Sequence, residues 1–334
     1  MKIVVDAYGG DNAPLEIIKG ALDALNEADD FSIVLSGKSE EIKKILAENG
    51  YAGNRIEIID APDVITNDDV PTDAIRQKRN SSLVKAFDYL NGDEDAKGFV
   101  SAGSTGAVLA GGVLLLKRIK GVQRPALAPI LPTLKGGHVM LIDCGANVEP
   151  KAINLVQFAQ MGAIYMKNVF GVENAKVGLL SNGTEDTKGS PLGKEAFPLL
   201  KEANINFSGN MEAREILSGE YDVVVADGYS GNIALKACEG TALAMFGLIK
   251  NGIMAGGLKA KIGYLLLKPV FKGIKKTMDY NDNGGAVLLG LEKVLVKSHG
   301  SSKAKAVKNS ILQARELINS GVIEGLKGEF TVAK

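Results

Sequence analysis

The stretch VVDAYGGDNAP, residues 4–14, contains one complete copy of the unit that decides the fold. Residues 4–7 predict a short strand, and the Gly, Asp and Asn within residues 8–12 are typical of a turn. A helix is expected to begin near Pro14, because the fixed φ and missing N–H of proline suit the first helical turn. A strand, a turn and a helix in this order form the repeating unit of a mostly parallel α/β sheet.

The same unit recurs through the whole chain. Apolar runs that predict strands precede loops rich in Gly, Asp, Asn, Ser and Thr, and these runs occupy residues 99–102, 139–142, 177–180, 221–226 and 294–296. We therefore predict an α/β fold in which helices sandwich a mostly parallel sheet. Residues 1–334 are expected to form a single domain, because neither a Pro/Ser-rich linker nor an internal repeat divides them. Ligands bind at the carboxyl ends of parallel strands, so these loops are the candidate site.

The composition excludes several classes of protein. The chain has 334 residues, 46% of them hydrophobic, with 39 basic and 39 acidic side chains, which is typical of a folded protein rather than a disordered or nucleic-acid-binding one. The 2 cysteines cannot build a disulfide framework, and Asp6 comes too early for a signal peptide, so we expect a cytoplasmic protein. No uninterrupted apolar run of about 18 residues occurs, so no membrane-spanning helix is expected.

The glycine-rich loops match neither standard nucleotide fingerprint. No two of the 40 glycines are separated by a single residue, and Ser32 stands where a P-loop ending at residues 37–39 would need glycine. Such loops can still present backbone N–H groups to phosphate at helix amino termini, although a tight turn explains each glycine taken alone. The phosphate-binding candidates are Gly9, Gly10, Gly103, Ser104 and Thr105.

Polar side chains in these loops can carry chemistry. Lys188 could neutralise phosphate or an oxyanion, and Asn232, at an expected helix start, could donate a hydrogen bond to a tetrahedral intermediate. A solvated lysine and an Asn that satisfies turn backbone are the alternatives. The acidic residues of the loops could bind a metal, act as acids or bases, or cap helices, and they are Asp6, Asp11, Asp143, Glu185, Asp186 and Asp227. Because no His or Cys cluster accompanies them, no metal site is expected.

A basic cluster follows a helix start expected near Thr72. It consists of Arg76, Lys78 and Arg79. These side chains could bind phosphate or an acidic protein, and a solvated helix face is the alternative.

The two cysteines, Cys144 and Cys238, are interpreted as small buried hydrophobes rather than as nucleophiles. A thiol nucleophile needs a neighbouring base, and the only histidines are His138 and His299. The strand predicted between His138 and Cys144 separates them by roughly 20 Å.

Residues 234–278 predict a helical hairpin that projects from the domain and turns near residues 256–257. Residues 240–278 hold seven lysines and no Asp or Glu, which leaves 32 basic residues against 39 acidic ones elsewhere. The lysines of residues 261–278 share one face of the predicted helix, and apolar side chains occupy the other face. This pattern is typical of helices that lie on anionic lipid. A contact with the core or with a second copy in a dimer is the alternative. The membrane-facing candidates are Leu258, Lys261, Leu266, Leu267 and Phe271.

Eight motifs, in order, resemble the PlsX family, the bacterial phosphate acyltransferases of phospholipid synthesis. They are VDAYGGDNAP (5–14), RQKRNSS (76–82), SAGSTGA (101–107), RPALAPILPT (124–133), DCGAN (143–147), SNGTEDTKGS (181–190), DGYSGN (227–232) and KSHGSS (297–302). The sequence departs from the family pattern at Tyr8, where Met is usual, at Ser104, where Asn is usual, and at Cys144, where an aliphatic residue is common.

The resemblance implies a fold like that of the isocitrate and isopropylmalate dehydrogenases, a homodimer, and no cofactor. It implies reversible transfer of a fatty acyl group from acyl-[acyl carrier protein] to inorganic phosphate, which gives acyl phosphate. That product would pass to a membrane glycerol-3-phosphate acyltransferase, so the enzyme is expected to associate peripherally with the inner face of the plasma membrane. The cluster at residues 76–79 is then the candidate carrier-protein contact.

In the mechanism that we expect, the glycine loops and Lys188 hold phosphate against the thioester. Asn232 donates a hydrogen bond to the carbonyl oxygen, and His299 is a further candidate, for protonating the leaving thiolate. Two alternatives stay open at this point: a phosphate acetyltransferase that uses coenzyme A thioesters, and a membrane-binding scaffold without catalytic activity.

Overall fold

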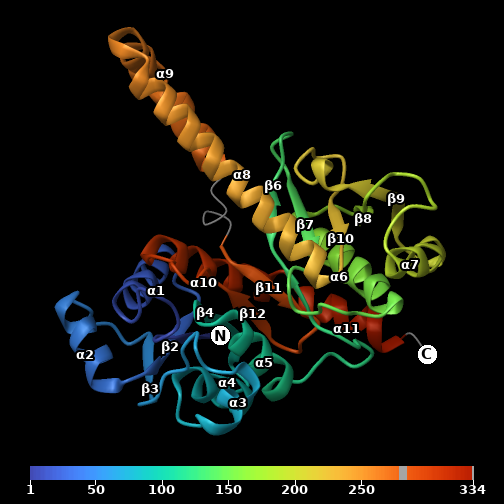
Figure 1. The fold of residues 1–334 in the computed structure, drawn as a ribbon. Helices are drawn as coiled ribbons and strands as arrows, with labels where there is room; N and C mark the ends of the chain where they lie inside the picture. Colours follow the sequence, from blue (N-terminus) through green and yellow to red (C-terminus); the bar gives the residue numbers. More distant parts are fainter. Residues whose placement is uncertain (278–283, 333–334) are drawn as a thin grey trace.

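The structure, a computed structural model, describes residues 1–277 and 284–332 and contains two β-sheets (Figure 1). The seven-stranded sheet comprises, in spatial order, β3 (Ile56–Asp60), β2 (Ser32–Gly37), β1 (Lys2–Asp6), β4 (Ala96–Ser101), β12 (Val294–Lys297), β11 (Ala286–Leu289) and β5 (Ala126–Ala128). The five-stranded sheet comprises β6 (Ile130–Pro132), β7 (His138–Ile142), β10 (Val223–Val225), β8 (Lys176–Ser181) and β9 (Asn206–Glu212). Most neighbouring strands are parallel, and β5, β6 and β11 supply the antiparallel pairs.

Helices follow most of the parallel strands, as the sequence pattern predicts. They are α1 (Leu15–Glu27), α2 (Ser39–Glu48), α3 (Pro71–Gln77), α4 (Ser82–Gly92), α5 (Thr105–Leu115), α6 (Ala152–Phe170), α7 (Pro191–Glu202), α8 (Gly228–Ala255), α9 (Gly257–Thr277), α10 (Ala304–Asn319) and α11 (Val322–Val332), with a short 3-10 turn at Ala213–Glu215. The predicted α/β sandwich of mostly parallel strands is confirmed, and each of the apolar runs predicted as a strand overlaps one.

The division into two sheets was not predicted, and it arises at Pro129. Strands β5 and β6 lie on either side of this residue, and they pair with β11 of the larger sheet and β7 of the smaller one. Proline has no N–H to donate to a strand ladder, so a strand tends to end there. The chain therefore passes from one sheet to the other at this point.

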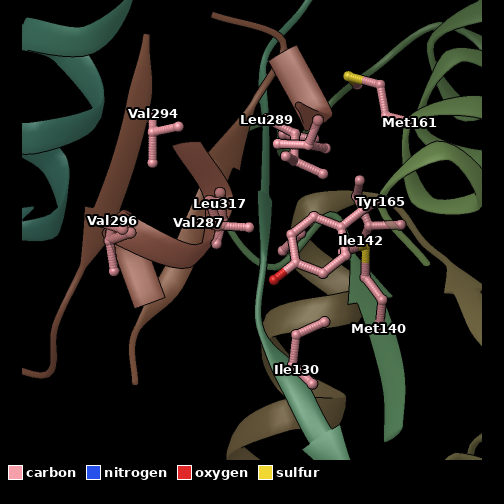
Figure 2. Packing of buried hydrophobic residues seen from close by; sticks show 14 of the residues in the cluster. Ile130, Met140, Ile142, Met161, Tyr165, Val287, Leu289, Val294, Val296 and Leu317 are labelled. Carbon is pink, nitrogen blue, oxygen red and sulfur yellow. The ribbon is translucent and has the colours of Figure 1, made fainter. Parts of the chain in front are cut away.

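The hydrophobic core is continuous across the two sheets. One cluster of buried side chains includes Val287 and Val296 of the larger sheet together with Met140 and Ile142 of the smaller one. Figure 2 shows these residues around the fully buried Tyr165 of α6. Because one core joins both sheets, the loops at their strand ends are held in a fixed relation to one another.

Helices α8 and α9 form a hairpin that runs away from both sheets (Figure 1). The predicted projecting hairpin is confirmed, with its turn at Gly256 and Gly257, and the latter adopts a φ of +71° that favours glycine. Its first helix begins at Gly228 rather than at residue 234. Met278, the last residue of the predicted hairpin, lies outside the described residues.

Helix α8 is long and apolar enough to cross a membrane, by length and composition only, and its most apolar window is not buried within the chain. It is the only such helix among residues 1–277 and 284–332. The search for an uninterrupted apolar run missed it, because Lys236, Glu239 and Lys250 interrupt the sequence. Core helices of proteins that do not span membranes can have the same length and composition.

Candidate active site

A cavity of about 230 Å³ opens where the two sheets meet. Its walls come from the segment that joins β5 to β6, from the first turns of α8, from the segment that precedes and begins β11, and from the loop after β12. Thr105, at the start of α5, and Cys144, after β7, complete it. Loops that are far apart in sequence therefore meet at the carboxyl ends of parallel strands, where α/β proteins bind ligands.

Three of the predicted loops touch one another at this edge of the larger sheet. The Asp11 N–H donates to the carbonyl of Gly300 over 2.8 Å, and the Asn12 amide donates to the carbonyl of Ser301 over 3.0 Å. At the third loop, the Gly103 N–H donates to Ser101 Oγ over 3.0 Å, and the Ser101 carbonyl accepts the Ser298 N–H of the KSHGSS loop over 2.9 Å. The loop after β1 and the end of β4 are thus both hydrogen-bonded to the KSHGSS loop after β12.

Glycine is required at residue 9 by close packing between these loops. A Cβ there would lie 2.6 Å from Asp6 Oδ2 and 2.7 Å from the Gly103 nitrogen. Any side chain would push the two loops apart. The structure therefore brings Gly9 and Gly103 of the predicted phosphate-binding set together. Gly10, with φ at +103°, packs against Ala102 and the Gly300 carbonyl.

Asn232 lines the cavity from the second turn of α8. The Asp227 side chain caps this helix by accepting a hydrogen bond from the Ser230 N–H over 2.8 Å. Glycine at residue 231 lets the helix approach the β7–α6 loop, because a Cβ would lie 1.9 Å from the Asp143 carbonyl oxygen. Asn232 itself is exposed, so its amide is accessible to a ligand in the cavity.

Asp143 orders the loop after β7. Its buried carboxylate accepts hydrogen bonds from the backbone N–H groups of Leu127, Ala146 and Asn147 and from the Asn147 amide, over 2.6 to 3.1 Å. Burial raises the pKa of Asp143 above its usual value, and these hydrogen bonds oppose that shift. The carboxylate is occupied by backbone donors, and its role is to shape the loop.

His299 lines the cavity from the loop after β12. Burial, followed by the nearby Lys236, lowers the pKa of His299, so the ring is neutral at neutral pH. Its Nδ1 accepts the Ser301 N–H over 3.2 Å, which places the proton of the neutral ring on Nε2. A neutral imidazole can orient a substrate by a hydrogen bond, whereas it is a weak source of protons.

Lys188 lies apart from the cavity lining, exposed in the loop between β8 and α7. The Asn210 amide holds this loop by donating to the carbonyl oxygens of Glu185 and Lys188 over 2.8 and 3.4 Å. Asp186 pairs with Lys201 over 2.7 Å. The backbone at Lys188 is thus held by hydrogen bonds, whereas its side chain is exposed to solvent.

The basic cluster at residues 76–79 lies at the end of α3. The Lys78 ammonium donates to Asp69 over 2.7 Å and to the Val64 carbonyl over 3.1 Å, which ties the preceding loop to the helix. Arg76 is exposed, and Arg79 lies 3.9 Å from Asp88. The helix begins at Pro71, as expected near residue 72, and two guanidinium groups remain on the surface.

Cys144 is buried, as predicted, whereas Cys238 is only half-buried. Burial raises the pKa of the Cys144 thiol well above its usual value, and the neighbouring Asp143 raises it further. A thiol that stays protonated is a poor nucleophile. Over the described ranges, no group of three His, Cys, Asp or Glu side chains is close enough to hold a metal ion.

Sequence reasoning missed Lys297 as a site residue. Its side chain lines the cavity between β12 and the His299 loop and is only 7% exposed. The available signal was a lysine placed directly after an apolar strand, at the first position of the KSHGSS motif. Lys236 and Glu239, which pair over 2.7 Å on α8, also line the cavity and were not singled out.

Comparisons with known proteins show the family and the fold of this chain. Residues 1–325 match the family model described as fatty acid synthesis protein. The chain is 48% identical over 327 residues to a phosphate acyltransferase from Clostridium novyi, covering 98% of each chain, and 50% identical to one from Streptococcus thermophilus, covering 98% of this chain and 97% of the relative. A crystal structure of a phosphotransacetylase from Streptococcus pyogenes shares the fold, with a TM-score of 0.61 and 19% identity, over 96% of this chain and 94% of that one.

Proposed function

The chain belongs to the fatty acid synthesis protein family and is a phosphate acyltransferase, and we propose that it transfers a fatty acyl group reversibly from acyl-[acyl carrier protein] to inorganic phosphate. The products are acyl phosphate and free carrier protein. Acyl phosphate is an activated acyl donor for phospholipid synthesis, and a membrane glycerol-3-phosphate acyltransferase is the proposed next enzyme. The reaction exchanges a thioester for an acyl phosphate without any change of oxidation state, so the proposal includes no cofactor.

One observation carries the proposal at the level of the site. Asn232, Thr105 and His299 line one cavity at the carboxyl ends of parallel strands, and the glycine loops meet beside it. Phosphate is charged and needs positioning and neutralisation more than deprotonation. The loops that contain Gly9, Gly10, Gly103 and Ser104, together with the ammonium of Lys188, are proposed to bind phosphate.

Asn232 is the proposed donor to the developing oxyanion. A phosphate oxygen attacks the thioester carbonyl carbon, the C–O bond forms, and negative charge gathers on the carbonyl oxygen. The Asn232 amide is exposed to the cavity and can donate to that oxygen. The C–S bond then breaks, and the thiolate leaves with the electron pair. His299 is positioned to orient this group, although its lowered pKa makes proton donation at neutral pH inefficient.

The acidic carrier protein is proposed to dock near the end of α3. Arg76 and Arg79 are exposed there, while Lys78 is engaged by Asp69. Guanidinium groups pair well with carboxylates at such surfaces. Reversing both guanidinium charges should raise KM for the carrier thioester and leave KM for phosphate unchanged.

The hairpin is proposed to bind the enzyme peripherally to the inner face of the plasma membrane. The enzyme is also proposed to be a homodimer. Leu258 and Leu266 are each 75% exposed and Leu267 is 51% exposed, with Phe271 half-buried and Lys261 exposed beside them. Exposed leucines together with lysines suit the boundary of an anionic bilayer. Sedimentation with vesicles containing phosphatidylglycerol, compared with neutral vesicles, tests the first point, and light scattering after size-exclusion chromatography tests the second.

The activity is tested with purified protein and palmitoyl-carrier protein, with and without phosphate. Free carrier thiol and acyl phosphate, trapped as the hydroxamate by hydroxylamine, should appear together and only with phosphate. Activity with acetyl-coenzyme A but not with the carrier thioester would favour a phosphate acetyltransferase. Lipid binding without activity on either thioester would favour a scaffold and would contradict the proposal.

A further inference from the structure

A row of three buried polar side chains crosses the carboxyl ends of three adjacent strands. Lys297 of β12 is the register partner of Ser101 of β4, and Val5 of β1 is the partner of Val100, so Asp6 follows in the same row. Ser101 Oγ donates to Asp6 Oδ2 over 2.8 Å. A carboxylate, a hydroxyl and an ammonium thus lie on one face of the sheet, at its edge nearest the cavity.

Lys297 is the only buried cation among the residues that the structure describes. An ammonium inside a protein loses its hydration, and this loss is costly unless other charges replace the water. Within the described ranges, the Lys297 ammonium donates one hydrogen bond, to the carbonyl of Ser298, although an ammonium has three donors. Burial lowers the pKa of Lys297 to about 8, and the charges of Asp6 and Asp11 oppose this shift. The head group is therefore short of negative charge.

The cavity presents a second feature that attracts anions beside this ammonium. Thr105 begins the eleven-residue helix α5 and lines the same cavity as Lys297. The Ser104 side chain makes no capping hydrogen bond there. The first N–H groups of a helix and its dipole favour a negative charge at this end. A buried ammonium and a helix amino terminus thus face the same space.

Lys236, the other lysine in the lining, is a weaker candidate for an anion. It is exposed, and its ammonium pairs with Glu239 over 2.7 Å. Its charge is therefore screened by solvent and compensated by a carboxylate. Lys297 is only 7% exposed and forms no salt bridge to a carboxylate within the part of the chain that the structure describes, so a ligand anion gains more from it.

We propose that Lys297 is a catalytic residue whose ammonium binds the inorganic phosphate directly, between the amino terminus of α5 and the thioester. This inference rests on the proposed function and names a ligand of its phosphate site. Lys297 keeps its proton throughout: the phosphate oxygen forms the new C–O bond, the C–S bond breaks, and the carrier thiolate takes its proton from solvent. The dianion replaces the missing negative charge around the ammonium.

The test compares Lys297→Met with Lys293→Met. Lys293 immediately precedes the same strand, is half-buried, and donates to the Ala96 carbonyl over 2.6 Å, but it lines a different cavity. Loss of a charged hydrogen-bond donor should raise KM for phosphate by about 10- to 100-fold in Lys297→Met. KM for palmitoyl-carrier protein should stay within about twofold, and Lys293→Met should keep both constants.

A second readout does not depend on turnover. Inorganic phosphate alone should raise the Tm of the wild-type protein and of Lys293→Met, because a ligand that binds the folded state stabilises it. The rise should vanish in Lys297→Met. A folded Lys297→Met that keeps both the phosphate KM and the Tm rise would overturn the proposal. If this variant does not unfold cooperatively, Lys297→Gln, which can still bond the Ser298 carbonyl, decides by the same two criteria.

Failure of the proposed function has a different signature. In one outcome, the wild-type protein forms no acyl phosphate while phosphate still raises its Tm and this rise is absent in Lys297→Met. That result would support the anion site and contradict the proposed transferase activity. If the wild-type enzyme is active and Lys297→Met is equally active at low phosphate, the transferase activity is supported and the proposed role of Lys297 is contradicted.

Discussion

The cavity and the hairpin depart from the usual rule of burial in opposite directions. The cavity region buries Asp6 and Lys297, whereas the hairpin leaves Leu258 and Leu266 exposed. Proteins normally bury apolar side chains and expose charged ones, so each departure costs free energy in the isolated chain. The difference teaches what each region lacks: an anion would compensate the ammonium in the cavity, and a lipid surface or a second copy would cover the leucines.

The sharpest test of the cavity as the catalytic region is Asn232→Ala. Removing one donor to an oxyanion typically lowers kcat by about 10²- to 10³-fold. The neighbouring Ile233→Ala is the matched control, since Ile233 is also exposed on α8 but does not line the cavity. Initial rates of hydroxamate formation measure the effect, and near-normal turnover of Asn232→Ala would remove this residue from the mechanism.

Lys188 tests whether the catalytic region extends beyond the cavity lining. If Lys188 contacts phosphate, Lys188→Ala should raise KM for phosphate by about 10- to 100-fold. The control is Lys194→Ala, another exposed lysine shortly after the same loop. Because Lys188 is exposed, neither variant should change the Tm appreciably. Equal phosphate KM values in the two variants would confine phosphate binding to the cavity.

The hairpin is tested by the double variant Leu266→Glu and Leu267→Glu. Two carboxylates on the exposed apolar surface should weaken binding to anionic vesicles by about tenfold and leave turnover on soluble carrier thioester unchanged. Leu134→Glu is the control, because Leu134 is 86% exposed but lies in the turn after β6. Vesicle sedimentation measures the binding. If the double variant lost turnover but still bound anionic vesicles, the hairpin would be needed for catalysis rather than for membrane binding.

The pH dependence of kcat/KM for phosphate tests whether the charge of the buried ammonium in the cavity is needed. The pKa of Lys297 is lowered to about 8, so its ammonium is charged below that pH and neutral above it. In the free enzyme, kcat/KM for phosphate should therefore fall as the pH rises through about 8, by about tenfold per unit beyond it. The charged and titratable side chains around Lys297 are Asp6, Asp11, Lys236, Glu239 and His299.

Lys297→Gln is the control for this profile, because its amide does not titrate and the alkaline limb should disappear. An unchanged limb in that variant would assign the titration to another group, such as the carrier thiol. Rates measured at low phosphate from about pH 6.5 to about pH 9.5 cover the transition on both sides of the shifted pKa.

The smallest effect is expected at Cys144, which lines the cavity without taking part in the chemistry. Cys144→Ala should change kcat by less than about threefold, because burial keeps its thiol protonated. The loss of a small buried side chain should lower the free energy of unfolding by about 1 kcal/mol. Steady-state rates and denaturant unfolding check both values. A large loss of kcat would instead indicate thiol chemistry.

Much of the fold could be predicted from the sequence, because strands and helices depend on local patterns. The apolar run at residues 294–296 predicts β12, and the cluster at residues 103–106 predicts the start of α5. The position of β12 between β4 and β11 could not be predicted in this way, since it depends on pairing across the whole chain. The same holds for the crossing between sheets at Pro129.

The candidate site divides along the same line. The sequence by itself determined the family, through eight ordered motifs, and with it the residue types available for phosphate and thioester chemistry. Only the tertiary structure decided which of them meet: Asn232 and His299 share a cavity, while Lys188 faces solvent in another loop. It alone revealed Lys297, because the burial of an ammonium is set by strand register and by the loops that close over it, and residue spacing records neither.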